Sequence, residues 1–167
     1  ESLKLREEIR DSSGWANTMY LLGVAYKNMG DVNSSLSYFK ASLKIYEAKK
    51  DKKQLAVVLN GLGNSYLKSN DLDSALSCFT EACRINESLG EEVNVQFNKV
   101  NIAATQIELG RNKFKEGDSI NGMKYALNAY ATYKQITTDS NSFFNEYQMY
   151  DVSKIGADTS MLGGKYD

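Results

Sequence analysis

The chain has no histidine and no proline among its 167 residues. Without an imidazole group, every catalytic mechanism or metal site that depends on histidine is excluded. Without proline, no position forces a helix to end or to kink. The two absences argue against a histidine-based active site and favour a protein made of long helices.

Cysteine is also scarce, with only Cys78 and Cys83 in the sequence. The two lie five positions apart on one expected helix, which places them about 140° apart around its axis. They are therefore poorly placed to bond to each other, and two thiols alone make no zinc site. We interpret both as small packing residues in a reducing compartment.

The charge is nearly balanced, with a formal net charge of −1 and a sequence pI of about 5.6. A protein that binds nucleic acid or an anionic membrane by charge needs a clustered basic face, which this composition does not suggest. No apolar run approaches the ~18–20 residues that span a bilayer. We therefore expect a cytoplasmic protein that needs no cofactor and binds neither nucleic acid nor membrane.

The sequence repeats itself at an offset of forty positions. Residues 2–39 and 42–79 share fourteen identities in thirty-eight aligned pairs. A fixed period of this length is typical of solenoids, in which each unit buries its apolar face against its neighbours. The residues that recur are Ser2, Leu3, Lys4, Glu7, Asp11, Ala16, Leu22, Gly23, Tyr26, Asp31, Ser34, Leu36, Ser37 and Phe39.

Within each unit the apolar residues have helical spacing, in two runs separated by a turn. Gly30-Asp31 and Asn70-Asp71 mark these turns, because glycine and asparagine tolerate the left-handed conformation after a helix and aspartate caps the next helix. The first unit carries its apolar residues at Met19, Leu22, Gly23 and Tyr26, and then at Leu36, Phe39, Leu43 and Tyr46.

This pattern resembles the tetratricopeptide repeat, a helix–turn–helix unit with Leu-Gly and Tyr on its first helix and Ala, Phe and Ala on its second. The matching residues are Leu22, Gly23, Tyr26, Phe39, Leu62, Gly63, Tyr66, Ala75, Phe79 and Ala82. Ser35 and Ser42 depart from it, since they stand where alanine is usual. The long period is similar to the extended repeats of kinesin light chains, cell-polarity adaptors and bacterial signalling regulators. The resemblance implies an all-α, right-handed superhelical solenoid of antiparallel helix pairs, with about three and a half repeats.

The third unit is longer than the other two. Asn70 maps to Gly110 at the offset of forty, whereas Gly30-Asp31 maps to Gly117-Asp118 at an offset of eighty-seven. Seven inserted residues make almost two helical turns, so the packing stripe keeps its phase. We therefore expect one long first helix at about 92–116. The expected segments are the end of a truncated repeat at 1–14, repeats at 15–54 and 55–91, an extended repeat at 92–138, and the first helix of a truncated repeat at 142–167.

The resemblance also implies a function, because the first helices of such repeats line a concave groove that holds a protein or an extended peptide. Asn60 and Asn64 stand one turn apart on one face, and amides can bind a peptide backbone without reading its side chains. The chaperone-tail version of this groove uses a lysine and an asparagine where this chain has Tyr20 and Val24, so we expect no such clamp. The groove candidates are Asn17, Tyr20, Val24, Lys27, Val57, Asn60, Asn64, Leu67, Phe97, Val100, Ala104 and Ile107.

Two other interpretations of the chain stay open. Residues 2–14 resemble arrays in bacterial regulators, so the alternative is a sensory or autoinhibitory repeat array of a larger signalling protein with a histidine kinase or a DNA-binding domain. A third is an enzyme whose catalytic domain lies outside these residues. The Gly61-Leu62-Gly63 run lacks the strand and the third glycine of a dinucleotide site, and we interpret it as helical packing. We expect no catalytic residues within the chain, and expect self-association if its terminal repeats expose apolar surface.

Overall fold

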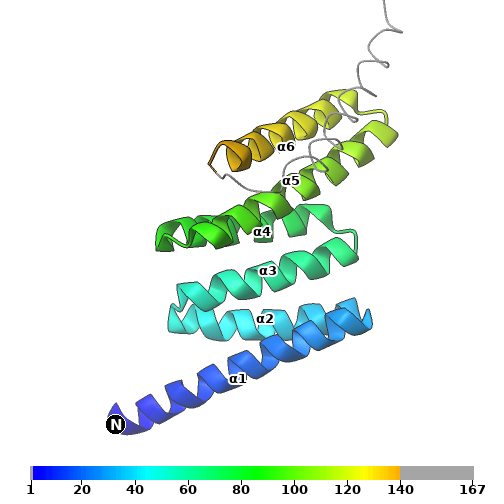
Figure 1. The fold of residues 1–167 in the computed structure, drawn as a ribbon. Coiled ribbons are helices and arrows are strands. Elements are labelled where there is room, and N and C mark those ends of the chain that lie inside the picture. Colours follow the sequence, from blue (N-terminus) through cyan, green and yellow to red (C-terminus); the bar gives the residue numbers. More distant parts are fainter. Residues whose placement is uncertain (1, 140–167) are drawn as a thin grey trace, which may run out of the picture. The chain divides into compact units, whose positions relative to one another are not determined.

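The protein is described by a computed structural model, which covers the backbone of residues 2–139 and the side chains of residues 12–136. Within that range every regular element is an α-helix (Figure 1). The predicted helix at 142–167 lies outside the described residues. The helices are α1 at Ser2–Met29, α2 at Val32–Lys49, α3 at Lys52–Lys68, α4 at Leu72–Leu89, α5 at Glu92–Lys115 and α6 at Ser119–Asp139.

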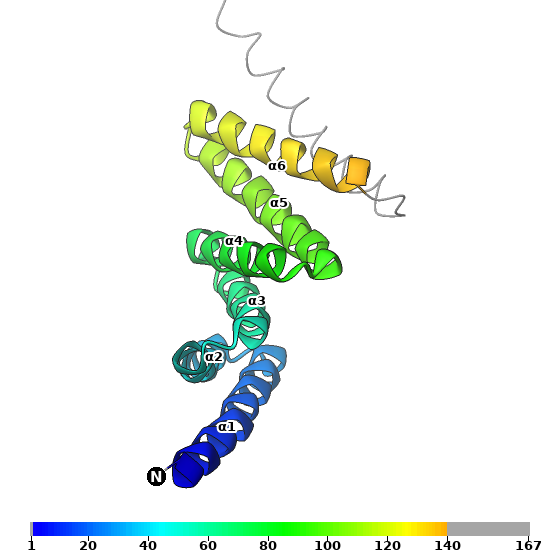
Figure 2. The ribbon, with the colours of Figure 1, turned by 90° about the vertical axis from the view of Figure 1, so that its left-hand side faces the viewer.

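The helices fall into two compact units, which divide between Val95 and Gln96. In the first unit α1 packs against α2, α2 against α3, and α3 against α4, while α1 also contacts α3. In the second unit α5 and α6 lie side by side, as both views show (Figures 1 and 2). Each unit is therefore built from antiparallel helix pairs, and the all-α prediction is confirmed.

The turns between paired helices have the predicted chemistry. Gly30 and Asn70 adopt left-handed backbone angles, with φ of 85° and 59°. The Asp31 carboxylate accepts a hydrogen bond from the Ser34 backbone N–H at 3.0 Å, which satisfies one of the free donors at the start of α2. Asp71 caps α4 in the same way. Each turn thus ends one helix and begins the next within two or three residues.

Helix α5 has the length expected from the sequence, whereas helix α1 crosses an expected boundary between two segments. Helix α5 has 24 residues against 17 in α3, a difference equal to the seven inserted residues. Helix α1, by contrast, runs without interruption through the expected boundary between residues 14 and 15. Gly14 alone costs a helix only about 1 kcal/mol relative to alanine, too little to end it. The repeat boundary there is not a helix boundary.

Close approach of the helices in the first unit depends on glycine. The fully buried Phe39 ring of α2 lies between Gly23 of α1 and Gly61 of α3. A Cβ added at either glycine would lie 2.7 Å from a ring carbon of Phe39, a distance that real Cβ atoms do not reach. Phe79 of α4 meets Gly63 of α3 in the same way. The glycines of the Gly61-Leu62-Gly63 run therefore serve packing.

Two buried serines join three helices of the first unit. The Ser35 hydroxyl of α2 lies 2.9 Å from the Gly23 carbonyl of α1 and 2.8 Å from the Ser65 hydroxyl of α3. The Ser65 hydroxyl also lies 3.1 Å from the Gly61 carbonyl of its own helix. The Ser35 and Ser65 hydroxyls together carry two hydrogens, which are shared among these three contacts. Serine at position 35, where the repeat that the sequence resembles usually has alanine, adds a polar link that alanine cannot make.

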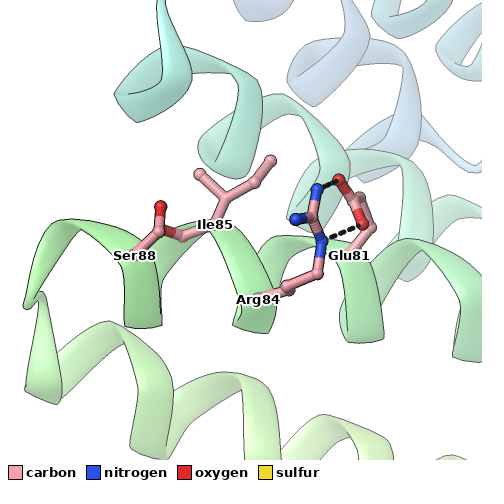
Figure 3. Close-up of polar contacts among 4 residues, drawn as sticks. All are labelled: Glu81, Arg84, Ile85 and Ser88. Carbon is pink, nitrogen blue, oxygen red and sulfur yellow. Dashed lines mark hydrogen bonds and ion pairs between the residues drawn. The ribbon is translucent and has the colours of Figure 1, made fainter.

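Helix α4 buries one face and exposes another (Figure 3). Ile85 is buried near Ala56 of α3. On the exposed side the Arg84 guanidinium donates two hydrogen bonds to the Glu81 carboxylate, at 2.6 and 2.9 Å, and these lower the pKa of Glu81. Ser88 donates to the Ile85 carbonyl at 2.7 Å. An exposed ion pair of this kind contributes little to stability, so the buried face holds α4 in place.

The second unit has its own core between α5 and α6. Phe114 of α5 packs on Gly122 of α6, where an added Cβ would lie 2.9 Å from the ring. Here the aromatic ring belongs to the first helix of the pair and the glycine to the second, the reverse of the arrangement around Phe39. The buried side chains of this core are Ala103, Ile107, Ala126, Ala129, Tyr133 and Ile136.

Candidate peptide-binding face

Helix α3 is packed on most of its circumference. Ala56, Val58, Leu62 and Ser65 are buried, and α1, α2 and α4 all contact this helix. The side chains that keep some exposure on the remaining face follow a spacing of three and four residues, which keeps them on one side of a helix. They are Lys53, Val57, Asn60, Asn64, Leu67 and Lys68.

Four of the predicted groove residues therefore lie on this open face of α3, and four more lie on α1. We call these eight residues the α1–α3 face. They are Asn17, Tyr20, Val24 and Lys27 on α1, and Val57, Asn60, Asn64 and Leu67 on α3.

The two amides at the centre of the α1–α3 face are linked along α3. The Asn64 side-chain nitrogen donates a hydrogen bond to the Asn60 carbonyl, one turn earlier, at 2.8 Å. This bond uses one of the two amide hydrogens of Asn64, and its amide oxygen takes no part in it. Both side chains are half-buried. Asn64 is thus held on its own helix while retaining donor and acceptor capacity.

The α1 side of the face is partly committed to the core. Tyr20 and Val24 pack against the cluster around Phe39, and the Tyr20 and Phe39 ring centroids are 5.5 Å apart. Both side chains remain half-buried, and Asn17 is exposed. Tyr20 and Val24 therefore fix α1 on α2 with their inner atoms and offer only their outer edges to a partner.

A lysine contact at one end of the face was not predicted from the sequence. Lys68 of α3 donates through Nζ to the Lys27 backbone carbonyl of α1 at 2.8 Å. The last carbonyls of a helix lack intrahelical donors, and a lysine is a favourable partner for them. The contact joins the C-terminal ends of the two helices. The sequence could have indicated that Lys68 lies on the same side of α3 as Asn64, because it follows Asn64 by four residues.

At the other end of α3, Lys53 pairs with Glu91 at 2.7 Å. The hydrogen bond from Lys53 to Glu91, and then their charge attraction, raise the pKa of Lys53. Lys53 also shares the open face of α3, four residues before Val57. It was not among the residues predicted from the sequence, although the same spacing indicates it.

The α5 candidates belong to the second unit and are described there by themselves. Phe97 is 64% exposed and Ala104 is exposed, whereas Val100 packs partly against the α5–α6 core. Ile107 is buried in that core. It lies one turn after Ala103, which faces α6, so its side chain serves packing and is not accessible to a partner.

The cysteines have the packing role predicted for them. Cys83 is buried, and Cys78 is half-buried against the cluster around Phe39. Neither of the two forms a disulfide with a described residue. Burial, then the charge of Asp71, raises the pKa of Cys78 to about 11, so its thiol stays protonated near neutral pH.

Chemistry-bearing clusters are scarce in the described part of the chain. Among those residues no three His, Cys, Asp or Glu side chains are grouped so that they could hold a metal ion. No helix there has both the length and the apolar character needed to cross a membrane. The arrangement of amides, apolar edges and lysine ends on the α1–α3 face is suited to non-covalent contact.

Comparison with known proteins agrees with the paired helices of the fold. Residues 15–88 match the family model described as the tetratricopeptide repeat, a range that begins within α1 and ends within α4. A search of curated proteins found no match. Repeats of this family are generally non-catalytic scaffolds for interactions between proteins. With their helix pairs and their buried Gly–Phe contacts, the matched residues 15–88 are tetratricopeptide repeats.

Proposed function

We propose that this protein is a non-catalytic scaffold that binds an extended segment of another protein on the α1–α3 face. The observation that carries the proposal is the open side of α3, which bears two amides one turn apart. An extended peptide has unpaired backbone N–H and C=O groups along its length, and an asparagine amide is a side chain that carries both donors and an acceptor for such groups.

The apolar residues beside the amides support the same proposal. Val57 is exposed and Leu67 is half-buried, one on each side of the asparagine pair along α3. Each would cover an apolar side chain of the bound segment and exclude water from the amide hydrogen bonds. Backbone recognition at the centre with apolar contacts around it favours an extended segment over a folded surface.

The proposal is tested by selecting random linear peptides, displayed on phage, against the whole chain. Binding of the selected peptides is then measured for the wild type and for the double variant Asn60→Ala with Asn64→Ala. Two lost hydrogen bonds of ordinary strength should weaken binding by about tenfold or more, since each contributes about 1 kcal/mol.

Asn33→Ala is the matched control, because it removes an exposed amide of α2 that is not one of the eight residues of the α1–α3 face. It should leave the affinity unchanged. Circular dichroism should show the same helix content in all three proteins. Equal affinities of the wild type and the double variant, with both folded, would place the binding site elsewhere.

A further inference from the structure

Helix α6 carries apolar side chains on a side that its core with α5 leaves exposed. Five residues on this side are spaced alternately by four and three positions, which keeps them on one face of a helix. Among them Ile120 is 85% exposed and Leu127 is 60% exposed. We call these five residues the α6 exposed face. They are Ile120, Lys124, Leu127, Ala131 and Lys134.

The equivalent positions of α2 and α4 are polar. Helix α6 corresponds to α2 at an offset of eighty-seven and to α4 at an offset of forty-seven, and the starts of the three helices agree with these offsets. The residues at the three apolar positions of the face are Asn33, Lys40 and Lys44 on α2, and Asp73, Thr80 and Arg84 on α4. All six are exposed. Packing of the helix pairs therefore does not require apolar side chains there, and those of α6 are suited to contact with another molecule.

The surroundings of the α6 exposed face are positively charged. Lys134 stands where α2 and α4 have Glu47 and Glu87. Residues 96–136 include six basic and three acidic residues, a formal net charge of +3, although the whole chain carries −1. The three carboxylates are already engaged within the unit, since Glu108 pairs with Arg111, Glu116 with Lys113, and Asp118 caps the start of α6. This charge favours an acidic partner.

We propose that the α6 exposed face docks an amphipathic helix of another protein. Apolar residues of that helix cover Ile120 and Leu127, and acidic residues beside them pair with Lys124 and Lys134. Ile120 and Leu127 are two turns apart, about 10 Å along the helix axis. A partner helix repeats its apolar residues at the same interval, whereas an extended segment does not.

A second copy of the chain and a membrane are weaker candidates for this surface. Two copies would bring the same lysines of both chains into one interface, and like charges across an interface weaken binding. A membrane would gain only three apolar side chains, with Lys124 among them, and membrane binding scales with the apolar area buried. The proposal goes beyond the function proposed above, because it concerns α6 and is independent of Asn60 and Asn64.

A library of helical peptides displayed on yeast tests the proposal. Each peptide has leucines spaced by three and four residues and random residues elsewhere, and the whole chain is the target. Peptides selected on the wild type should be enriched in Asp and Glu beside the leucines. Selection on the double variant Lys124→Gln with Lys134→Gln should lose this enrichment. The double variant Lys44→Gln with Lys52→Gln should keep it, because it removes two exposed lysines that are not part of the α6 exposed face.

The affinity of the selected peptides is then compared between apolar variants. Leu127→Ser should weaken binding by about tenfold, because it removes the central apolar contact. Ile120→Ser provides a second variant, since Ile120 is the most exposed residue of the face. Met29→Ser is the matched control, because it removes a 77% exposed apolar side chain from α1, and it should leave the affinity unchanged.

Circular dichroism should show the same helix content in every variant. A selection without binders, or binders without acidic enrichment, overturns the proposal. So do equal affinities of the wild type and both serine variants of α6. Binding of the wild type to phosphatidylserine vesicles that Leu127→Ser abolishes would assign the face to a membrane instead, and a dimer in light scattering that Leu127→Ser disperses would assign it to a second copy.

Discussion

Phe39 illustrates how much of the packing depends on single residues. The sequence indicated that Gly23 and Phe39 belong to one packing motif, and the structure confirms their contact. The sequence did not indicate that Gly61 contacts the other side of the Phe39 ring, because that contact depends on how α3 packs on α2. The Ser35–Ser65 pair escaped prediction for the same reason. A departure from alanine was visible in the sequence, but its hydrogen-bond partner was not.

Two glycines of α1 allow a matched test of this packing. Gly23→Ala should destabilise the protein by about 1 kcal/mol or more, because overpacking costs about 1–3 kcal/mol and outweighs the gain in helix propensity. Gly14→Ala should stabilise it by about 0.5–1 kcal/mol, since nothing lies within 4 Å of an added Cβ there.

Urea denaturation followed by circular dichroism measures both changes. The midpoint should fall for Gly23→Ala and rise for Gly14→Ala. A rise for both variants would mean that the Phe39 ring moves freely and that the close contact is not a constraint.

At the scale of helices, the sequence predicted the lengths and turns better than it predicted single contacts, because offsets and turn residues indicate them directly. The difference between the two offsets predicted the long α5, and the Gly-Asp and Asn-Asp pairs predicted the turns before α2 and α4. The turn at Lys50 was not predicted, because lysine adopts its left-handed conformation, at φ of 54°, without a sequence signal. Helix α1 likewise continues past Gly14, since nothing near it stops a helix.

The cap at the start of α2 should make stability depend on pH. Hydrogen bonds from the Ser34 side chain and backbone lower the pKa of Asp31 below its ordinary value of 3.8. A carboxyl whose pKa is lowered by folding stabilises the protein above its unfolded-state pKa, and this contribution is lost as the pH falls through the folded-state value.

Asp31→Asn retains a good capping residue but cannot ionise. Its urea midpoint should therefore fall less than that of the wild type when the pH is lowered from 6 to about 3. Identical pH dependence of the two proteins would show that the charge of this cap does not contribute to stability.

At the scale of the whole molecule, the repeats and the helical architecture support the proposal of a scaffold that binds other proteins. The matched repeats over residues 15–88 are built from helices whose exposed faces are surfaces for contact. The eight residues of the α1–α3 face stay predictions, made from repeat positions that recur at a fixed offset, and they omit Lys53 and Lys68 on the same side of α3. Sequence spacing did not separate Ile107, which is buried, from Phe97, which is exposed, since both fit one stripe of α5.

The role of the α1–α3 face is tested most directly by nuclear magnetic resonance of the asparagine side-chain amides. A peptide selected on the whole chain would be titrated into the isotope-labelled protein. The account predicts that the side-chain signals of Asn60 and Asn64 shift as the peptide binds, while those of Asn33 on α2 and Asn128 on α6 stay in place. Shifts confined to Asn33 or Asn128, with the α3 asparagine signals unmoved, would contradict it.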